Sequence, residues 1–272
     1  MNLNNKMSLF YIFGLILIVY LIVALGLYIF QRKLLYHPNF SNHVTGDGLI
    51  HSIEKINIKT EDNIDLKGWF HLKDLKKKTI LFFHGNAGTL DNRIYKLNFL
   101  GNLDINFLII AWRGYSGSSG KPTEPGLYQD AKSAVNWLNL KGMAEKNIIL
   151  YGESLGTSVA IEIGQNKNFA GIILEAPFTS MVDTGKKHYP FFPVKLLLKD
   201  KYESKNKIKN IKFPILVMHG KKDKIIPFYM GEAIYNLANE PKFKYFSDND
   251  DHMIDFDENL VNEISSFLKS LN

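Results

Sequence analysis

The sequence predicts an α/β fold, in which a mostly parallel central sheet is flanked by helices and preceded by an N-terminal transmembrane helix. Three observations lead to this prediction. An uncharged apolar run comes first, two segments with alternating apolar and polar residues follow, and six nearly continuous apolar segments then alternate with helix-length stretches. Strands that are apolar on both faces are typical of a parallel sheet covered by helices. The 272 residues suffice for one sizeable domain behind the apolar run.

The apolar run spans Leu9–Phe30 and contains no charged residue. As a helix it would be about 33 Å long, enough to cross the hydrocarbon core of a bilayer. Tyr11 and Tyr28 lie near its ends, where aromatic residues favour the membrane interface, and Arg32-Lys33 follows as a stop. The alternative is a cleaved signal peptide, because Ala24-Leu25-Gly26 loosely fits a small-x-small site. We expect an uncleaved single-pass anchor, and the nearly balanced flanking basic residues leave its orientation open.

This anchor divides the chain into four parts, which are a short flank (1–8), the transmembrane segment (9–30), a polar linker (31–52) and the main domain (53–272). At the start of the domain, Glu54–Thr60 and Ile64–Leu72 alternate apolar and polar residues around a turn. This alternation predicts an antiparallel hairpin at a sheet edge. Residues 178–210 interrupt the later alternation of strands and helices with an apolar and basic stretch that contains prolines, "YPFFPVKLLLKDKY". We expect this interval to be an inserted cap.

Six core strands are expected in the domain, beginning at Thr79, Asn106, Asn147, Ala170, Phe213 and Lys242. Helices are expected between most of them and at the end of the chain, at Leu90–Leu103, Gly126–Leu140, Leu155–Gly164, Phe228–Ala238 and Glu258–Leu271. Right-handed crossovers would connect neighbouring parallel strands through these helices.

Composition excludes several kinds of site. The chain has no cysteine, so disulfides, thiolate metal sites and a cysteine nucleophile are ruled out. The histidines show no metal-ligand spacing and no nucleotide-binding glycine motif is in a suitable place, so no cofactor or metal is expected. The net charge is +6, and residues 185–224 carry much of it as lysines. A solvated surface or attraction to anionic lipid headgroups explains these lysines, and nucleic-acid binding is not expected because no recognition motif accompanies them.

The candidate nucleophile is Ser154, in the stretch "YGESLG" between an expected strand and an expected helix. A G-x-S-x-G turn in this context exposes a serine at the carboxyl ends of the strands, where ligands bind in open parallel sheets. Gly152 and Gly156 suit the tight turn, because only small residues fit two positions before and after the serine. Ordinary turn chemistry is the alternative. The partners of the serine decide between the two.

A serine hydroxyl needs a base to take its proton and an acid to orient that base. Asp223 follows the late strand "PILVMHG", and His252 lies in the loop after the next strand. Their order along the chain fits the order that this fold requires, which is serine, acid and histidine. As alternatives, Asp223 caps the helix that begins near Pro227, His252 is a surface histidine in an acidic loop, or Glu175 is the acid.

The oxyanion hole is expected from two loops. "FFHGNAG" follows the first core strand, and its glycines let Asn86 or Ala87 present a backbone N–H to the pocket. The second donor is the N–H of Leu155, the residue after the nucleophile. His84 in the same loop is expected to be a structural hydrogen-bonding residue rather than a second base.

With these residues in place, the sequence resembles the α/β-hydrolase superfamily, and in particular its membrane-anchored serine hydrolases with a short cap. The resemblance runs from about residue 34 to 271 and rests on "FFHGNAG", "WRGYSGSSGKPTEPG", "YGESLGTSVA", "LEAPFTS", "YPFFPVKLLLKDKYES", "ILVMHGKKDKIIP" and the histidine loop. It implies a nucleophile, an acid, a base and two oxyanion-hole residues, which are Ser154, Asp223, His252, Asn86 and Leu155. Two positions depart from the family pattern: Ala111 replaces a usual aspartate, and Asn-Asp-Asp replaces the usual glycine before His252.

The expected function is hydrolysis of carboxylic esters or thioesters through an acyl-enzyme on Ser154. The expected partners are a small-molecule or lipid-like acyl substrate and the membrane that holds the N-terminal helix. A peptidase or amidase is an alternative, because serine acyl transfer also cleaves amides. A second alternative is a catalytically silent, membrane-tethered binding domain, since a fold does not guarantee chemistry.

Overall fold

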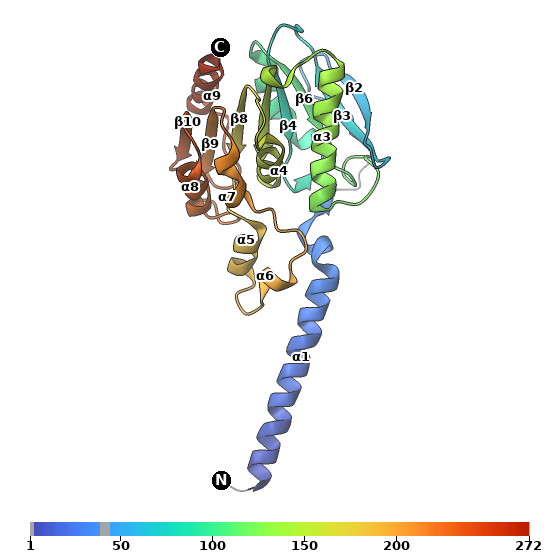
Figure 1. Ribbon diagram of the computed structural model, residues 1–272, viewed down its shortest axis with the longest axis vertical. Coiled ribbons are helices and arrows are strands. Elements are labelled where there is room, and N and C mark those ends of the chain that lie inside the picture. Colours follow the sequence, from blue (N-terminus) through green and yellow to red (C-terminus); the bar gives the residue numbers. More distant parts are fainter. Residues whose placement is uncertain (1–2, 39–43, 272) are drawn as a thin grey trace.

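Helix α1 (Leu3–Leu35) projects from the α/β domain as a long rod in the computed structural model, which describes residues 3–38 and 44–271 (Figure 1). Its stretch Phe10–Leu35 contains an 18-residue window with a mean hydropathy of 2.8, none of which is buried by the rest of the chain. Length and composition suit a membrane span and a signal sequence alike. The helix also includes residues 31–35, which the sequence predicted to be part of the linker, and Gln31 and Arg32 in this last stretch bond to the cap. Linker residues 39–43 lie outside the described part of the chain.

In the described part of the chain, the central sheet has eight strands in the spatial order β10-β9-β8-β7-β4-β6-β3-β2. In chain order they are β2 (Glu54–Lys59), β3 (Asp65–His71), β4 (Thr79–Phe83), β6 (Asn106–Ile110), β7 (Ile148–Glu153), β8 (Gly171–Glu175), β9 (Ile215–Gly220) and β10 (Lys242–Ser247). The strands from β10 to β6 are parallel, and β3 and β2 form the antiparallel edge hairpin. The predicted α/β fold is confirmed.

Helices connect and cover these strands (Figure 1). They are α2 (Ile94–Asn102), α3 (Glu124–Leu140), α4 (Leu155–Gly164), α8 (Phe228–Leu237) and α9 (Glu258–Ser270), with short 3-10 helices η1 (Leu90–Arg93), η2 (Glu145–Asn147) and η3 (Ile208–Asn210). Strands β4, β6, β7, β8 and β9 are buried along their whole length. The apolar residues on both faces of these strands therefore meet helices rather than water.

The register of the central strands brings their carboxyl ends to one level. Phe83 at the end of β4 pairs with Gly152 of β7, which pairs with Leu174 of β8. The loops that follow these strands consequently meet above the same edge of the sheet, where ligands bind in α/β folds.

Between β8 and β9 the chain forms three short helices, which are α5 (Met181–His188), α6 (Val194–Leu197) and α7 (Ser204–Lys207). The first two lie beside the part of α1 that is nearest to the domain (Figure 1). Arg32 of α1 donates two hydrogen bonds to the Asp200 carboxylate, at 2.8 and 3.1 Å. Two short strands, β1 (His37–Pro38) and β5 (Ala87–Gly88), pair in parallel and join the end of α1 to the loop after β4.

Candidate active site

Ser154 occupies the sharp turn between β7 and α4, at the carboxyl end of the parallel strands. Its φ of 51° and ψ of −113° are uncommon for any residue other than glycine. The Ser154 N–H donates to the Glu175 carbonyl at 2.8 Å, which fixes the turn to the end of β8. Backbone strain of this kind costs about 1–3 kcal/mol and is concentrated at functional sites. The surrounding structure thus holds the partly buried Ser154 in one position on the turn.

Close backbone contacts explain the two glycines that flank Ser154. A Cβ at Gly152 would lie 2.5 Å from the Thr157 Cα, and a Cβ at Gly156 would lie 2.0 Å from the Phe83 carbonyl oxygen. Both distances are far below van der Waals contact. The turn and the start of α4 can therefore pack against β4 only when both positions are glycine.

Asp223 and His252 come together from the loops after β9 and β10. The His252 Nδ1 lies 2.7 Å from the Asp223 Oδ2, and the Asp223 side chain is fully buried. The other oxygen, Oδ1, accepts the N–H groups of Ile225 and Ile226 at 2.8 Å each. Burial by itself would raise the pKa of Asp223, but hydrogen bonds from His219 and His252 outweigh it and hold this pKa well below the usual range. The carboxylate is therefore an anion that orients the imidazole.

The alternative assignments for these residues do not agree with this geometry. Helix α8 begins at Phe228 and its N-cap is Pro227, so Asp223 is not the capping residue. Glu175 is engaged elsewhere, because its carboxylate accepts from Lys96 at 2.6 Å and from the Tyr151 hydroxyl at 2.6 Å. Gly220 explains how the histidine loop reaches Asp223, since a Cβ there would lie 2.2 Å from the Asp251 carbonyl oxygen.

His219 is a neighbour of Asp223 that the sequence analysis missed. Its Nε2 lies 3.0 Å from the Ile226 carbonyl oxygen and 3.2 Å from the Asp223 Oδ2, and its side chain is fully buried. Within the described residues, the His219 Nδ1 has no hydrogen-bond partner. Its position at the end of β9, four residues before the candidate acid, is the sequence feature that would have indicated His219. Asp223 therefore lies between two imidazoles.

The loop after β4 faces Ser154 and carries the expected oxyanion-hole residue Asn86. Its side-chain amide is already engaged, because Nδ2 donates to the Leu35 carbonyl at the end of α1 and Oδ1 accepts from the Tyr115 hydroxyl at 3.0 Å. The Asn86 amide is thus not free to bind a ligand in this structure. Leu155 is the first residue of α4, and a first-turn N–H has no acceptor within its helix.

The neighbouring loop after β6 contains Arg113, and Ala111 precedes it in place of the family's usual aspartate. Asp130 of α3 supplies the missing carboxylate, since it accepts the Arg113 backbone N–H at 2.9 Å and Nε at 2.8 Å. Asp62 binds the outer nitrogens of the same guanidinium. The loop after β6 is consequently held in place by helix α3.

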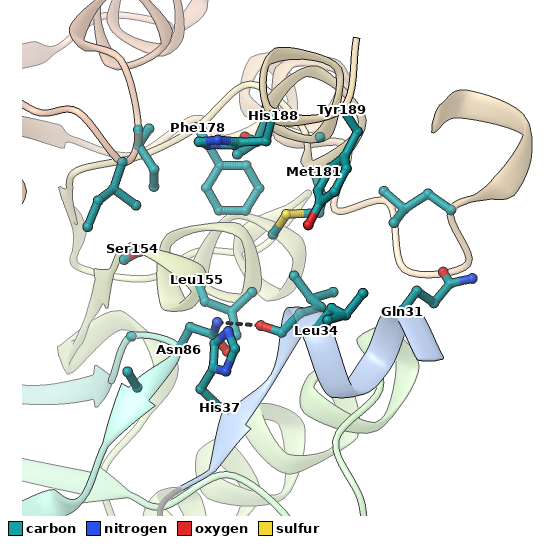
Figure 2. Close-up of a pocket in the computed structure, with 18 of the residues that line it drawn as sticks. Gln31, Leu34, His37, Asn86, Ser154, Leu155, Phe178, Met181, His188 and Tyr189 are labelled. Atoms are coloured by element: carbon teal, nitrogen blue, oxygen red, sulfur yellow. Dashed lines mark hydrogen bonds between the residues drawn. The ribbon is translucent and has the colours of Figure 1, made fainter. Parts of the chain in front are cut away.

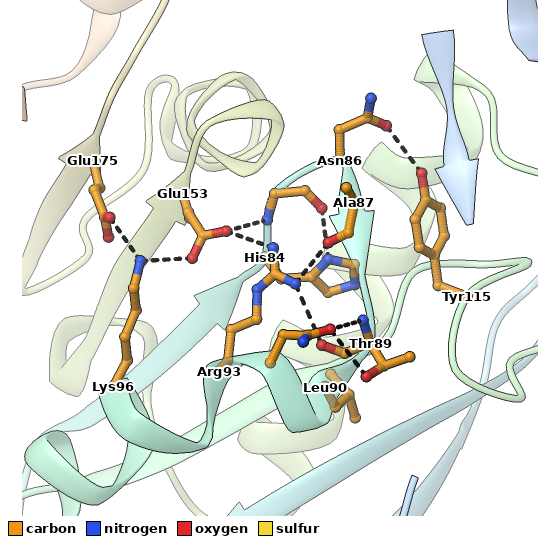
Figure 3. A network of polar contacts seen from close by, with 12 residues as sticks. His84, Asn86, Ala87, Thr89, Leu90, Arg93, Lys96, Tyr115, Glu153 and Glu175 are labelled. Carbon is orange, nitrogen blue, oxygen red and sulfur yellow. Dashed lines mark hydrogen bonds and ion pairs between the residues drawn. The ribbon is translucent and has the colours of Figure 1, made fainter. Parts of the chain in front are cut away.

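A buried charged network lies directly behind the Ser154 turn (Figure 3). Glu153 accepts from Arg93 at 2.6 Å, from Lys96 at 2.7 Å and from the Gly85 N–H at 3.1 Å. Burial by itself would raise the pKa of Glu153, but the charges of Lys96 and Arg93 lower it well below the usual range. Arg93 also donates to the Ala87 carbonyl at 2.6 Å. The network therefore fixes the loop after β4 to the residue that precedes Ser154.

Ser154, Leu155, Asn86 and His252 line one cavity of about 750 Å³. Figure 2 shows Ser154 on one side of it and Leu34 of α1 on the other. In the part of the chain that the structure describes, no hydrogen bond joins the Ser154 hydroxyl to His252. Catalytic hydrogen bonds are often long in the absence of substrate and shorten when it binds. A missing bond between Ser154 and His252 is therefore compatible with a nucleophile and its base. The described residues also contain no cluster of three metal-ligating side chains.

Comparison with known proteins identifies the family. The profile of the prolyl oligopeptidase family matches residues 122–268, just over half of the chain. The chain belongs to this family of the α/β-hydrolase superfamily. A Mycobacterium tuberculosis (strain H37Rv) protein, Rv2307c, is 33% identical to this α/β-hydrolase over 228 residues, which cover 81% of each chain.

Two further relatives carry an activity in their names. The Pyrococcus furiosus esterase Pf2001 superposes on 87% of this α/β-hydrolase and on 100% of its own chain, with a TM-score of 0.72 and 23% identity, which shows the shared fold. The Xenopus tropicalis lysophosphatidylserine lipase ABHD12 is 28% identical over 211 residues, or 70% of this chain and 54% of that protein. The chain is a hydrolase of the α/β-hydrolase type, and these relatives support ester hydrolysis in general.

Proposed function

We propose that the chain is a membrane-anchored serine hydrolase that cleaves carboxylic ester or thioester bonds of lipid-like acyl substrates. The observation that carries this proposal is the 2.7 Å contact between His252 and the buried Asp223, in the same cavity as the strained Ser154. Ser154 and His252 come from separate loops and line one cavity, and Asp223 from a third loop holds His252. Their meeting is what acyl transfer by a serine requires.

In the proposed mechanism, the Ser154 Oγ attacks the carbonyl carbon of the substrate while the His252 Nε2 takes its proton. Asp223 holds the Nδ1 side of the ring and stabilises the imidazolium that forms. The N–H of Leu155 and an N–H of the loop after β4 receive the oxyanion. Collapse of the intermediate expels the alcohol or thiol, which takes the proton from His252. Water then attacks the acyl-enzyme by the reverse sequence and releases the carboxylic acid.

The membrane part of the proposal rests on contacts between α1 and the domain. Leu27, Gln31 and Leu34 of α1 line the cavity that contains Ser154. The Tyr36 and Tyr202 hydroxyls meet at 2.7 Å in a buried position just after α1. Cleavage after Gly26 would leave these residues in place, but it would remove the Tyr20 contacts with the cap, which are a hydrogen bond to the Phe191 carbonyl at 3.0 Å and stacking on the Phe192 ring. Retention of α1 as an anchor preserves them.

The lipid-like character of the substrate rests on the lining of the cavity. Apolar side chains of α1 and the cap form much of the cavity wall, among them Leu34, Phe178 and Met181 (Figure 2). Phe192 of the cap also lines the cavity. A cavity of about 750 Å³ can bury a medium or long acyl chain. The relative ABHD12, a lysophosphatidylserine lipase, supports the same class of substrate.

A fluorophosphonate probe tests the proposed nucleophile. We expect it to label the wild-type protein, and mass spectrometry to place the adduct on Ser154, because the probe reacts only with an activated serine. Ser154→Ala should remove the label. Ser158→Ala is the matched control, since Ser158 is a buried serine one turn further along α4 that bonds to Ser204. Labelling that persists in Ser154→Ala would contradict the assignment, and absence of labelling in the wild type would favour a silent binding domain.

Acyl-chain length tests the substrate class. We expect kcat/KM for p-nitrophenyl esters to rise about a hundredfold from butyrate to octanoate, because each buried methylene contributes about 0.8 kcal/mol. The esters should be assayed below their critical micelle concentrations. A profile that peaks at acetate or butyrate would rule out the lipid-like class while leaving the serine mechanism intact.

Amide hydrolysis is the second candidate, because the matching profile is that of the prolyl oligopeptidase family. A matched pair of octanoyl esters and octanoyl anilides separates the two activities. Anilide turnover within tenfold of ester turnover would favour the peptidase or amidase alternative.

A further inference from the structure

The tip of the cap carries apolar side chains that no other part of the described chain covers. Phe191 is 85% exposed and Leu196 is 82% exposed, and both belong to the segment Tyr189–Leu197, here called the cap tip. The apolar surface of α1 is exposed directly beside it. Adjacent exposed apolar surfaces of this kind indicate contact with a partner or a membrane.

Contacts with α1 define how far the cap tip reaches along the helix. The Tyr20 hydroxyl donates to the Phe191 carbonyl at 3.0 Å, and the Tyr20 and Phe192 rings stack with centroids 5.1 Å apart. Tyr20 lies in the middle of the uncharged run Leu9–Phe30. It is ten residues, or about 15 Å along the helix, from Phe30. This length corresponds to about half of a hydrocarbon core of roughly 30 Å, which is one leaflet.

Polar groups lie at the other end of the same contact. Gln31 donates to the Leu197 carbonyl at 3.1 Å, and the Lys199 ammonium lies 4.1 Å from the centre of the Tyr28 ring. Arg32 pairs with Asp200. Apart from the exposed Lys195, whose long side chain can extend toward the headgroups, the cap tip is apolar and lies level with the middle of the uncharged run. The charged residues that follow the tip lie level with the basic end of α1, as the interface between headgroups and hydrocarbon requires.

Most of the backbone N–H groups in the cap tip donate to carbonyls of the protein. Pro190 and Pro193 have no N–H, and the N–H groups of Phe192 and Val194 donate to carbonyls within the tip at 3.2 and 2.8 Å. The N–H groups of residues 196 and 197 bond to the Pro193 carbonyl, at 2.9 and 3.1 Å. Tyr20 supplies the donor for the Phe191 carbonyl. Backbone groups in hydrocarbon must find such partners within the protein.

We infer that the cap tip inserts into the leaflet nearest to the catalytic domain and packs there against α1. The cavity that contains Ser154 then opens sideways into this leaflet, because Leu27 and Leu34 of α1 and Phe192 and Leu197 of the cap form its far wall. An acyl chain reaches Ser154 from the leaflet without crossing water. This route for the acyl chain rests on the proposed function, whereas insertion of the cap tip does not.

Insertion is tested by fluorescence quenching in lipid vesicles. The chain contains no cysteine, so Phe191→Cys and Leu196→Cys each give one labelling site for an environment-sensitive fluorophore. Leu140→Cys is the matched control, because Leu140 is 88% exposed at the end of α3 that lies away from α1. With full-length protein in phosphatidylcholine vesicles, acyl-brominated lipid should quench the labels at 191 and 196 at least twofold and leave the label at 140 unchanged.

The opposite results would overturn the inference. Equal and weak quenching at positions 191, 196 and 140 means that the cap tip lies in water. Protection of the labels from aqueous iodide without quenching by brominated lipid means that a second copy of the chain, rather than the bilayer, covers the tip.

The entry route has a separate kinetic test. Phe191→Asp/Leu196→Asp should lower hydrolysis of a long-chain monoacylglycerol in vesicles at least tenfold and leave hydrolysis of soluble p-nitrophenyl butyrate unchanged, since neither residue lines the cavity. Leu140→Asp should affect neither substrate. Equal losses on both substrates, or no loss on the vesicle substrate, would overturn the entry route. If the wild type hydrolysed neither the monoacylglycerol nor p-nitrophenyl esters of any chain length, the proposed function would fall and the quenching result would still decide insertion.

Discussion

Replacing Ser154 with alanine is expected to lower kcat for ester hydrolysis by about a millionfold, and adding His252→Ala to this variant should cause almost no further loss. The reason is that a nucleophile and its base act as one unit, so that removal of either abolishes the same pathway. Asp223→Asn alone should cost about ten-thousandfold, because the imidazole then loses its 2.7 Å anionic partner and its preferred tautomer.

Turnover of p-nitrophenyl butyrate by the purified full-length variants measures these effects. Asp251→Asn is the control for Asp223→Asn, since Asp251 lies in the histidine loop and its carboxylate accepts the Met253 N–H. It should retain activity within about threefold. Losses that multiply in the Ser154→Ala/His252→Ala double variant would mean that the two residues act independently, which a shared acyl-transfer mechanism does not allow.

The fold was predictable because its determinants are local. Apolar segments such as those of β4 and β7 are long enough, and apolar enough on both faces, to indicate buried parallel strands. The edge hairpin followed from alternation along Glu54–Thr60 and Ile64–Leu72, and β2 and β3 pair there. The end of α1 was less predictable. Arg32 and Lys33 looked like the end of the apolar helix, but Arg32 bonds to Asp200, 168 residues away, and the helix continues past it.

The positions of the candidate site residues also followed from a local rule, since each lies just after a strand of a parallel sheet. What could not be read from the sequence are the contacts between distant side chains. Nothing near Asn86 indicates that its amide binds the carbonyl of Leu35, 51 residues earlier. This contact and the β1–β5 pairing attach the end of α1 to the loop that faces Ser154. Helix α1 is therefore a structural neighbour of the candidate oxyanion hole.

The buried network behind Ser154 was the largest omission of the sequence analysis, because its side chains come from four elements, η1, α2, β7 and β8, and no spacing rule connects them. Lys96 is completely buried and bridges Glu153 at 2.7 Å and Glu175 at 2.6 Å (Figure 3). Burial by itself would lower the pKa of Lys96, but the two carboxylates outweigh it and raise this pKa above its ordinary value. The ammonium is thus a fixed positive charge between two buried acids.

Lys96→Met should accordingly reduce the free energy of unfolding by about 3–5 kcal/mol, because it leaves buried carboxylates without their countercharge. Lys132→Met on the exposed face of α3 is the control and should change stability by less than about 0.5 kcal/mol. Adding Glu175→Gln to Lys96→Met should restore part of the loss, since it removes one of the unpaired charges.

Denaturant unfolding of the full-length variants in detergent, followed by tryptophan fluorescence, measures these differences. A loss of less than about 1 kcal/mol in Lys96→Met would show that water or protonation of a carboxylate replaces the missing ammonium, and that the network is not a rigid support.

The network also explains why a charged residue precedes the nucleophile. Through its bonds to Arg93, Lys96 and the Gly85 N–H, Glu153 connects the Ser154 turn to the loop that faces it. Loss of Lys96 should therefore lower kcat in the folded fraction as well as stability, because the distance between nucleophile and oxyanion donors is no longer fixed.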